Sequence, residues 1–368
     1  MSGTVGTNSG RVSGTIGAAA AGPTVSASDP AIDTNAAVGT QWANSASGEF
    51  FVCTDATTDE NVWTNVGDGT GDISPWAYGG TAYGHTLAGG AYPYGNVHDR
   101  FSFTSDGDAA DVGDTTGTRA YGCANKSTTH AYFSGGSTAL TITSASDKVS
   151  FASGGDSVAT GDTLTTTNRY QVESNDIDNQ IGYLACGKGS GSATRIEKLA
   201  FASDTFSTSS ASAYNDANGC AGNSSKTYGY IMGDKDSPYT LIQKYVFASE
   251  STGTEVGSLT IAMSGSVWNG TSSTEYGYCA GTSGAGPADD SIQKQSFSSD
   301  GDSTDVGNLL TAFGWAAGQS STTYGYVSSG VYPTAHNVIQ KYSFSSDGNS
   351  TDVGDVTVAR YGPCGSEV

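Results

Sequence analysis

Three arginines, each followed within two residues by a tyrosine, are the residues of this chain whose types and spacing best suit ligand chemistry. Arg119 and Arg360 both lie sixteen residues after a phenylalanine of the repeat described below, and Arg169 lies eighteen residues after another. Guanidinium groups that converge from neighbouring structural units can bind a carboxylate through paired hydrogen bonds, as in sialidase-like propellers. The candidate glycan-binding set is Arg119, Tyr121, Arg169, Tyr170, Arg360 and Tyr361. The alternative, that these side chains pack between repeats, is the more common role for such residues.

A catalytic role has less support in the sequence. The SSDG stretches lack the tryptophan and the spacing of the sialidase Asp box, and no Tyr-Glu nucleophile pair can be assigned. The acidic turns, such as SDGDAADVGD at 105–114, lack the ligand spacing of a calcium-binding EF-hand. The histidines show no HExxH spacing, and no phosphate-binding loop is present. We therefore expect no catalytic residues, no metal site and no cofactor.

An internal repeat defines the elements that must position the candidate residues. Its frame is a phenylalanine in a short strand, a lysine or arginine three residues earlier, a polar turn, and often Val-Gly nine residues after the phenylalanine. A second phrase, clearest as TYGYVSSG at 323–330, precedes most frames. Successive phenylalanines are 48, 50, 46, 50 and 47 residues apart. They are Phe103, Phe151, Phe201, Phe247, Phe297 and Phe344.

The repeat predicts an all-β protein, because a period of this length with about four short strands per copy is typical of a β-propeller. We expect six blades over residues 76–368. The last strand of the chain has no sequential partner, and the first copy lacks its preceding strand. Residues near Cys364 are therefore predicted to complete the blade that contains 83–119, which closes the ring without exposed edges.

The basic residue of the frame recurs in all six copies, as Arg100, Lys148, Lys198, Lys244, Lys294 and Lys341. It could form a basic ring for an anionic glycan. We favour a structural role, since ligand sites usually break the symmetry of a repeat. In that role the aliphatic stem packs between blades and the charge pairs with an acid such as Asp305 or Asp352.

The first 75 residues lie outside the repeat. Residues 1–37 are mostly Gly, Ala, Ser and Thr, and such a segment cannot offset its ordering entropy alone. We predict an extended, low-complexity anchor held by a partner. Residues 38–75 predict a small β module, whose core would come from Trp42, Phe51 and Trp63 among others. That core is too small to be stable alone, which also indicates an assembly.

The charge balance excludes several classes of partner. The chain has 15 Lys and Arg against 36 Asp and Glu, a formal charge of -21. Nucleic acid is therefore an unsuitable ligand. No apolar run is long enough to span a membrane, and the N-terminus has no secretory signal pattern. The six cysteines show no CxxC pair and suit free core residues in a chain made in a reducing cytoplasm.

The module GEFFVCTDATTDENVWTNVG, followed by TYGY…GG and IQKYSFSSDGNSTDVGD repeats, resembles virion structural proteins of marine bacteriophages. These are tail-fibre-like, spike-like or capsid-attached proteins with kelch-like propellers. The resemblance implies a non-enzymatic virion part, made in the host cytoplasm and present in many copies per particle. Residues 1–74 would bind other virion proteins, and the propeller would contact a host-surface glycan or decorate the tail or outer capsid.

Two alternatives remain open at this point. A glycan hydrolase or lyase built on the propeller predicts two carboxylates about 5–10 Å apart in one polar pocket. A purely architectural spacer predicts no ligand site at all.

Overall fold

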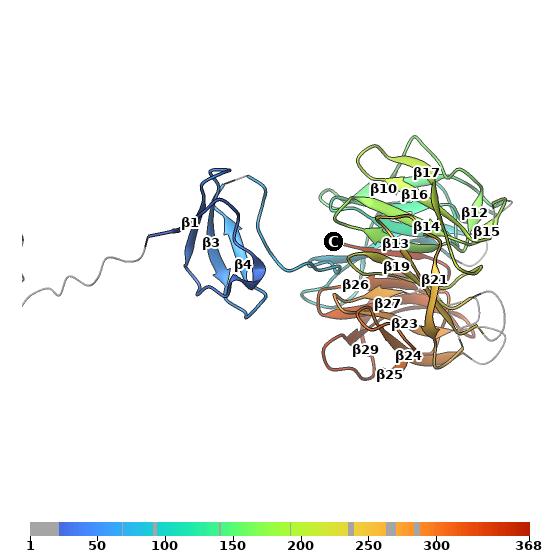
Figure 1. The fold of residues 1–368 in the computed structure, drawn as a ribbon. Coiled ribbons are helices and arrows are strands. Elements are labelled where there is room, and N and C mark those ends of the chain that lie inside the picture. Colours follow the sequence, from blue (N-terminus) through green and yellow to red (C-terminus); the bar gives the residue numbers. More distant parts are fainter. Residues whose placement is uncertain are drawn as a thin grey trace, which may run out of the picture. The chain divides into compact units, whose positions relative to one another are not determined.

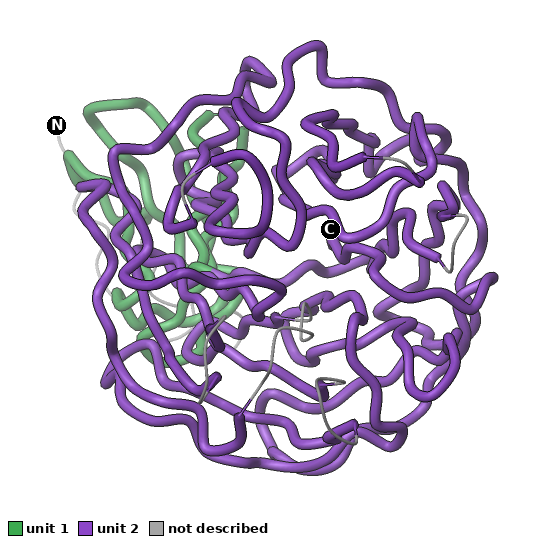
Figure 2. Tube along the Cα trace, turned by 90° about the vertical axis from the view of Figure 1, so that its right-hand side faces the viewer, with its two compact units in different colours: residues 1–76 green, residues 77–368 purple. Residues whose placement is uncertain are grey.

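The computed structural model describes residues 22–67, 69–90, 94–139, 141–191, 193–234, 239–262, 270–282 and 288–368. The chain divides into two compact units, Met1–Trp76 and Ala77–Val368 (Figure 2). Both units are built from β-strands. Within the described residues there is no α-helix, and so no helix suited to crossing a membrane.

The first unit contains one four-stranded sheet with the order β1-β2-β3-β4 (Figure 1). Strands β1 and β2 are parallel and the other neighbours are antiparallel. Its core is formed by Phe51, Cys53 and Trp63, which are fully buried. The sheet takes in residues from the range 1–37, which we expected to be extended; residues 1–21 of that range lie outside the described part. The elements are β1 (Thr24–Ser26), η1 (Ile32–Thr34), β2 (Gln41–Asn44), β3 (Phe50–Asp55) and β4 (Val62–Asn65).

The second unit contains six four-stranded antiparallel sheets in its described residues, numbered here 1 to 6 in the order of the six frames. Sheet 1 comprises β30 (Cys364–Glu367), β5 (Tyr83–Gly89), β6 (Gly95–Ser102) and β7 (Ala110–Asp114). Sheet 2 comprises β8 (Cys123–Lys126), β9 (His130–Ser134), β10 (Ser146–Ser150) and β11 (Val158–Ala159). Sheet 3 comprises β13 (Val172–Asp176), β14 (Ile181–Ala185), β16 (Arg195–Ala200) and β17 (Thr205–Ser212).

The remaining sheets follow the same pattern. Sheet 4 comprises β18 (Ala221–Ser224), β19 (Tyr228–Met232), β20 (Leu241–Val246) and β21 (Thr254–Ser258). Sheet 5 comprises β22 (Thr271–Ser272), β23 (Tyr276–Thr282), β24 (Asp289–Ser296) and β25 (Thr304–Asn308). Sheet 6 comprises β26 (Ala317–Ser320), β27 (Tyr324–Val331), β28 (Ala335–Ser343) and β29 (Thr351–Arg360). A separate two-stranded pair joins β12 (Asn168–Arg169) to β15 (Lys188–Gly189).

The first strands of the six sheets contact one another in a complete cycle. The contacts are β8 with β13, β13 with β18, β18 with β22, β22 with β26, β26 with β30, and β30 with β8. Glycines permit this approach: a Cβ on Gly365 of β30 would lie 1.9 Å from the carbonyl oxygen of Gly318 in β26. Any side chain there would push the two strands apart.

The C-terminal strand pairs with the sheet that the first frame builds. β30 runs antiparallel to β5, with Cys364 opposite Leu87 and Glu367 opposite Gly84. In Figure 2 the trace of residues 77–368 has a rounded outline, and the C-terminal end of the chain lies within it rather than at its rim. The cysteines, Cys364 included, are free and buried.

Tyrosine–phenylalanine pairs join five of the six sheets to the next. The second tyrosine of the Tyr-Gly-Tyr phrase stacks on the frame phenylalanine of the following sheet, with ring centroids 4.7–4.9 Å apart. The pairs are Tyr132–Phe201, Tyr183–Phe247, Tyr230–Phe297, Tyr278–Phe344 and Tyr326–Phe103. In sheet 6 the glycine between the two tyrosines is required as well, because a Cβ on Gly325 would lie 2.6 Å from the Tyr342 ring.

The recurring lysines have the structural role expected of them, but with different partners. Lys294 and Lys341 pair with neither Asp305 nor Asp352 but with the acid three residues after the phenylalanine of the next frame. That position adopts positive φ, which places its carboxylate over the preceding sheet. The pairs are Lys148–Asp204, Lys198–Glu250, Lys244–Asp300, Lys294–Asp347 and Lys341–Asp106. For Arg100 the corresponding residue of the next frame is Gly154 and not an acid, and the guanidinium lies over the Tyr83 ring.

The Asp-Gly turns also hold neighbouring sheets together. Gly107 donates its backbone N–H to the carbonyl of Val353, and Asp355 donates its own to Oδ1 of Asp108, at 2.7 and 3.0 Å. A Cβ on Gly354 would lie 2.3 Å from the carbonyl carbon of Gly107. In the four copies that have the Val-Gly step, glycine is needed because the turn of the next sheet packs directly on it.

Candidate functional site

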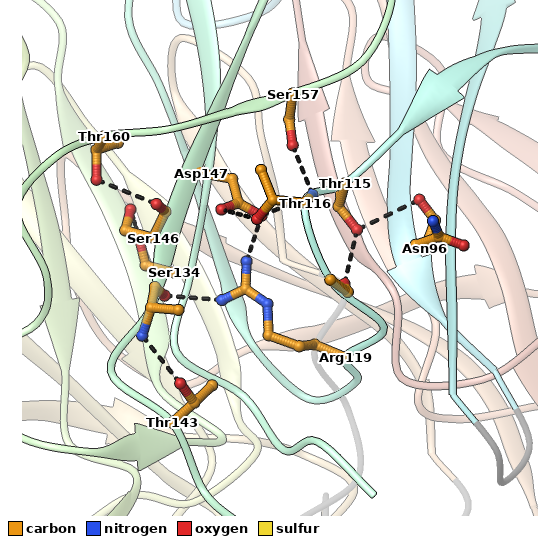
Figure 3. Close-up of polar contacts among 12 residues, drawn as sticks. Asn96, Thr115, Thr116, Arg119, Ser134, Thr143, Ser146, Asp147, Ser157 and Thr160 are labelled. Atoms are coloured by element: carbon orange, nitrogen blue, oxygen red, sulfur yellow. Dashed lines mark hydrogen bonds and ion pairs between the residues drawn. The ribbon is translucent and has the colours of Figure 1, made fainter.

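Arg119 is buried in the protein and is bound by protein groups. Its Nη2 lies 2.5 Å from Oδ2 of Asp147 (Figure 3). Its Nη1 donates to the carbonyls of Gly135 and Ala145. Asp147 also accepts hydrogen bonds from the backbone N–H and the hydroxyl of Thr116. Arg119 and Asp147 are 3% and 1% exposed, so this guanidinium is not available to a ligand.

Arg360 occupies the equivalent position between sheets 6 and 1. It is 2% exposed, lies 2.9 Å from the fully buried Asp99, and donates to the carbonyl of Thr86. Asp99 in turn accepts hydrogen bonds from the N–H and hydroxyl of Thr357. Two of the three candidate arginines therefore join sheets and do not face solvent.

A comparison between sheets explains why these arginines are needed. The residue that lies four before the frame phenylalanine is buried in every sheet, and in sheets 4, 5 and 6 it is Gln243, Gln293 or Gln340. Each glutamine amide both accepts from and donates to the backbone of one loop residue, as Gln340 does with Thr311. Asp99 and Asp147 stand at this position in sheets 1 and 2. A carboxylate can only accept, and its buried charge requires a cation.

Arg169 differs from the other two arginines. It is half-buried, donates to the hydroxyl of Ser137, and lies with its guanidinium 4.6 Å from the centre of the Tyr170 ring. Among the described residues it has no carboxylate partner. The three arginines thus do not form a common clamp for a carboxylate.

The three candidate tyrosines, in contrast, come together. Tyr121 is edge-on to Tyr170 at 5.3 Å and lies 6.2 Å from Tyr361, measured between ring centroids. Trp315 and Tyr94 join them, 5.4 and 5.6 Å from Tyr121. We call these five residues the aromatic mouth. Tyr121 is buried at its centre, and the other four are partly exposed.

The aromatic mouth is held by a chain of backbone hydrogen bonds around the cycle of first strands. Gly362 donates to Trp315, Tyr121 donates to Gly362, Tyr170 donates to Tyr121, and Gly219 donates to Tyr170. Tyr121, Tyr170 and Trp315 adopt φ of 66°, 62° and 54°. Bulky residues are uncommon in this left-handed region, and such backbone strain is concentrated at functional sites.

The opposite ends of the same first strands meet the segment that leads into the unit. The Tyr78 hydroxyl accepts a hydrogen bond from Asn175 Nδ2, and its ring lies 4.0 Å from Lys126 Nζ. Gly80 pairs with Ser321 next to the end of β26, and Ala82 donates to the carbonyl of Val368. Residues 77–82 therefore cover this end, while the aromatic mouth marks the other.

Two glutamates, Glu173 and Glu367, line the narrow space between the ends, where the hydrolase alternative could place its two carboxylates. Lys126 lies 2.6 Å from Glu367 in a buried ion pair, and the thiol of Cys123 lies 3.8 Å from Glu173. Desolvation raises the pKa of Glu173 to about 8. The cavity that both glutamates line has a volume of about 20 Å³, which holds a water molecule but no sugar ring. In the described residues no group of three His, Cys, Asp or Glu side chains is arranged to hold a metal ion.

A groove adjoins the aromatic mouth at Trp315 and Tyr361. Its volume is about 560 Å³, and its other wall is the hairpin that joins β27 to β28. Sequence reasoning missed Tyr94, Trp315 and Tyr332. Trp315 could have been found by register, because it lies eighteen residues after Phe297 as Tyr121 lies eighteen after Phe103, whereas our search followed arginine spacing.

No protein-family model matches the chain, and no curated protein is similar to it.

Proposed function

We propose that residues 77–368 form a closed six-bladed β-propeller. Three observations support the proposal: six four-stranded sheets, the cycle of contacts between their first strands, and the pairing of β30 with β5. Electron microscopy of the purified chain is expected to give ring-shaped projections with six-fold pseudosymmetry. Projections with another number of blades, or an open arc, would contradict it.

We further propose that the protein is a non-catalytic structural component of a bacteriophage virion that attaches the particle to a host-surface glycan. The aromatic mouth carries this proposal. Partly exposed tyrosine and tryptophan rings offer rigid apolar faces with polar edges, a combination enriched at binding surfaces. In this function many copies, each with modest affinity, act together on one cell surface.

The first unit supplies the contact with other virion proteins in this proposal. Val25, Val38 and Val66 are 68%, 65% and 62% exposed, although the unit is small. Burying these side chains against another protein would remove apolar surface from water, which is favourable. Whether that protein belongs to the tail or the capsid would follow from cross-linking the first unit within assembled particles.

The test of attachment uses the full chain. Labelled protein is expected to bind intact host cells, and Tyr361→Ala is expected to reduce the bound fraction while leaving the melting temperature close to that of the parent. Incubation with isolated surface polysaccharide is expected to leave its length unchanged. Shortening of the polysaccharide would overturn the non-catalytic role, and failure to bind either cells or polysaccharide would overturn attachment.

A further inference from the structure

The groove beside the aromatic mouth is built by the second-to-third-strand hairpin of sheet 6. Its strands β27 and β28, of eight and nine residues, are the longest second and third strands in the described part of the unit. Gly314, next to Trp315, pairs with Val331 at the end of β27, which fixes the hairpin to the mouth. His336 Nε2 lies 2.8 Å from the carbonyl oxygen of Tyr332 and holds the hairpin tip.

The groove offers aromatic faces with few polar groups. Trp315 and Tyr361 lie at its inner side, 5.5 Å apart between ring centroids, and Tyr332 at the hairpin tip is 41% exposed. Val331, Pro333, Thr334 and Ala335 complete the described lining, so none of the described lining residues is charged. A volume of about 560 Å³ is within the range of small-molecule sites.

The electrostatics of the protein disfavour an anionic occupant. The formal charge is -21, and ten of the described Lys and Arg side chains are already paired with protein carboxylates. Near the aromatic mouth the described cations without such a partner are Arg169, on the Tyr170 side, and Lys188, opposite it in the β12–β15 pair; neither lines the groove. An anionic polymer would thus meet a repulsive field and no compensating cation among the described residues of the groove.

We infer that this groove, which we call the Trp315 groove, binds a neutral sugar ring whose apolar C–H face stacks on Trp315 and Tyr361, with Tyr332 closing over its outer edge. Uncharged hydroxyls at the ring rim then remain hydrated or bond to Thr334 and the tyrosine hydroxyls. The inference rests on the proposed glycan attachment and names the ligand class: neutral surface polysaccharides, not those rich in uronic acid, sialic acid or phosphate.

The experiment is binding of the full chain to an array of neutral and acidic bacterial polysaccharides at low and high salt. The variants are Trp315→Ala, Tyr332→Ala and Arg169→Met. Tyr214→Ala is the matched control, because Tyr214 is a 53% exposed tyrosine outside the groove. Neutral members are expected to bind with little salt dependence. Trp315→Ala is expected to weaken binding at least tenfold and Tyr332→Ala several-fold, while Arg169→Met and Tyr214→Ala leave it unchanged at unaltered melting temperature.

Other outcomes separate this inference from the function on which it rests. Binding confined to acidic members, lost in high salt and in Arg169→Met, would overturn the neutral ligand and retain glycan attachment. Binding to neutral members that survives Trp315→Ala would overturn the location. The inference would also be overturned if the protein bound a polyproline peptide and no glycan, or if it bound cells but no glycan on the array. Absence of binding to both cells and glycans would overturn the attachment function itself.

Discussion

Lys341 in sheet 6 forms an ion pair with Asp106 in the first turn of sheet 1, at 2.5 Å between Nζ and Oδ2, although the two residues are 235 positions apart in the chain. The same sheets are joined by Tyr326 stacked on Phe103, with ring centroids 4.7 Å apart. One contact is electrostatic and partly exposed, and the other is aromatic and mostly buried. Their energies should therefore differ widely.

Lys341→Met is expected to lower the free energy of unfolding by less than about 1 kcal/mol, since the two side chains are 18% and 37% exposed and the pair is screened by water and salt. Tyr326→Ala is expected to cost about 3–5 kcal/mol, because it removes a fully buried ring. Chemical denaturation of both variants at low and high salt provides the measurement. If Lys341→Met cost more stability than Tyr326→Ala, the ion pair and not the aromatic contact would be the main connection between these sheets.

Exchanging the buried ion pair of sheet 2 for the glutamine of sheets 4 to 6 tests the structural role of Arg119. Arg119→Met alone should cost about 3–5 kcal/mol, because it leaves Asp147 buried without a cation. The double variant Arg119→Met with Asp147→Gln should recover most of that loss, because the amide can bond to the Thr116 backbone as Gln340 does to Thr311. Urea denaturation measures both.

Lys226→Met is the control for that exchange, since Lys226 and Asp178 are 62% and 46% exposed and 3.8 Å apart. It should change stability by at most about 0.5 kcal/mol. The double variant should also keep the glycan affinity of the parent. If the double variant were as stable as the parent but bound glycan more weakly, Arg119 would have a role in glycan binding.

Sheet 1 departs from the repeat at a buried histidine pair, and this should make it sensitive to acid. His85 stands where other sheets carry the stacking tyrosine, and its Nδ1 lies 2.8 Å from Nε2 of His98. Desolvation lowers the pKa of His85 to about 3 and that of His98 to about 4. The charged neighbours are Asp99, Arg100 and Arg360. Both folded-state pKa values lie below the ordinary value of 6.5, so the unfolded chain binds more protons between pH 6.5 and about 4.

Stability should therefore fall as the pH drops through that window, by a few kcal/mol at pH 4. The variant His85→Tyr with His98→Ile installs the residues found at these positions in sheets 4 to 6 and should flatten the decline. Denaturation midpoints at pH 7, 5.5 and 4 give the comparison, with the carboxylates common to both proteins cancelling. Equal slopes for the two proteins would show that the histidines do not drive the acid response.

The pairing of β30 with β5 was predictable from the sequence, because the sixth frame leaves a strand without a neighbour and the first frame lacks one. The second and third strands of each sheet were also predictable, because the Tyr-Gly-Tyr phrase and the frame phenylalanine mark them in the sequence. The partner of Lys341 was not predictable from the sequence. Asp106 and Asp352 are both acids near similar turns, and only the stagger between neighbouring sheets brings Asp106 to the lysine. The aromatic mouth was found in part: three of its four tyrosines were identified through their arginine neighbours, yet Arg119 and Arg360 lie buried against aspartates. No sequence pattern near Arg119 shows that Asp147, 28 residues later, stands where sheets 4 to 6 carry a glutamine.

Glu173, in the narrow space between the two ends of the first strands, should make the protein less stable at alkaline pH. Burial raises its pKa to about 8 from an ordinary 4.5, so the folded protein holds a proton that the unfolded chain releases between those values. Its contribution to stability should decline as the pH rises from about 4.5 to about 8. Glu173→Gln keeps the neutral shape of the protonated acid and removes this decline. The free energy of unfolding of this variant should match that of the parent near pH 4.5 and exceed it by a few kcal/mol at pH 8.5, as measured by urea denaturation.

Glu367→Gln is the contrast. It removes the partner of the buried Lys126 and should destabilise the protein at both pH values, since Glu367 forms an ion pair and Glu173 does not. If Glu173→Gln gave the same stability difference at both pH values, the carboxyl would be ionised throughout and would need a cation as partner.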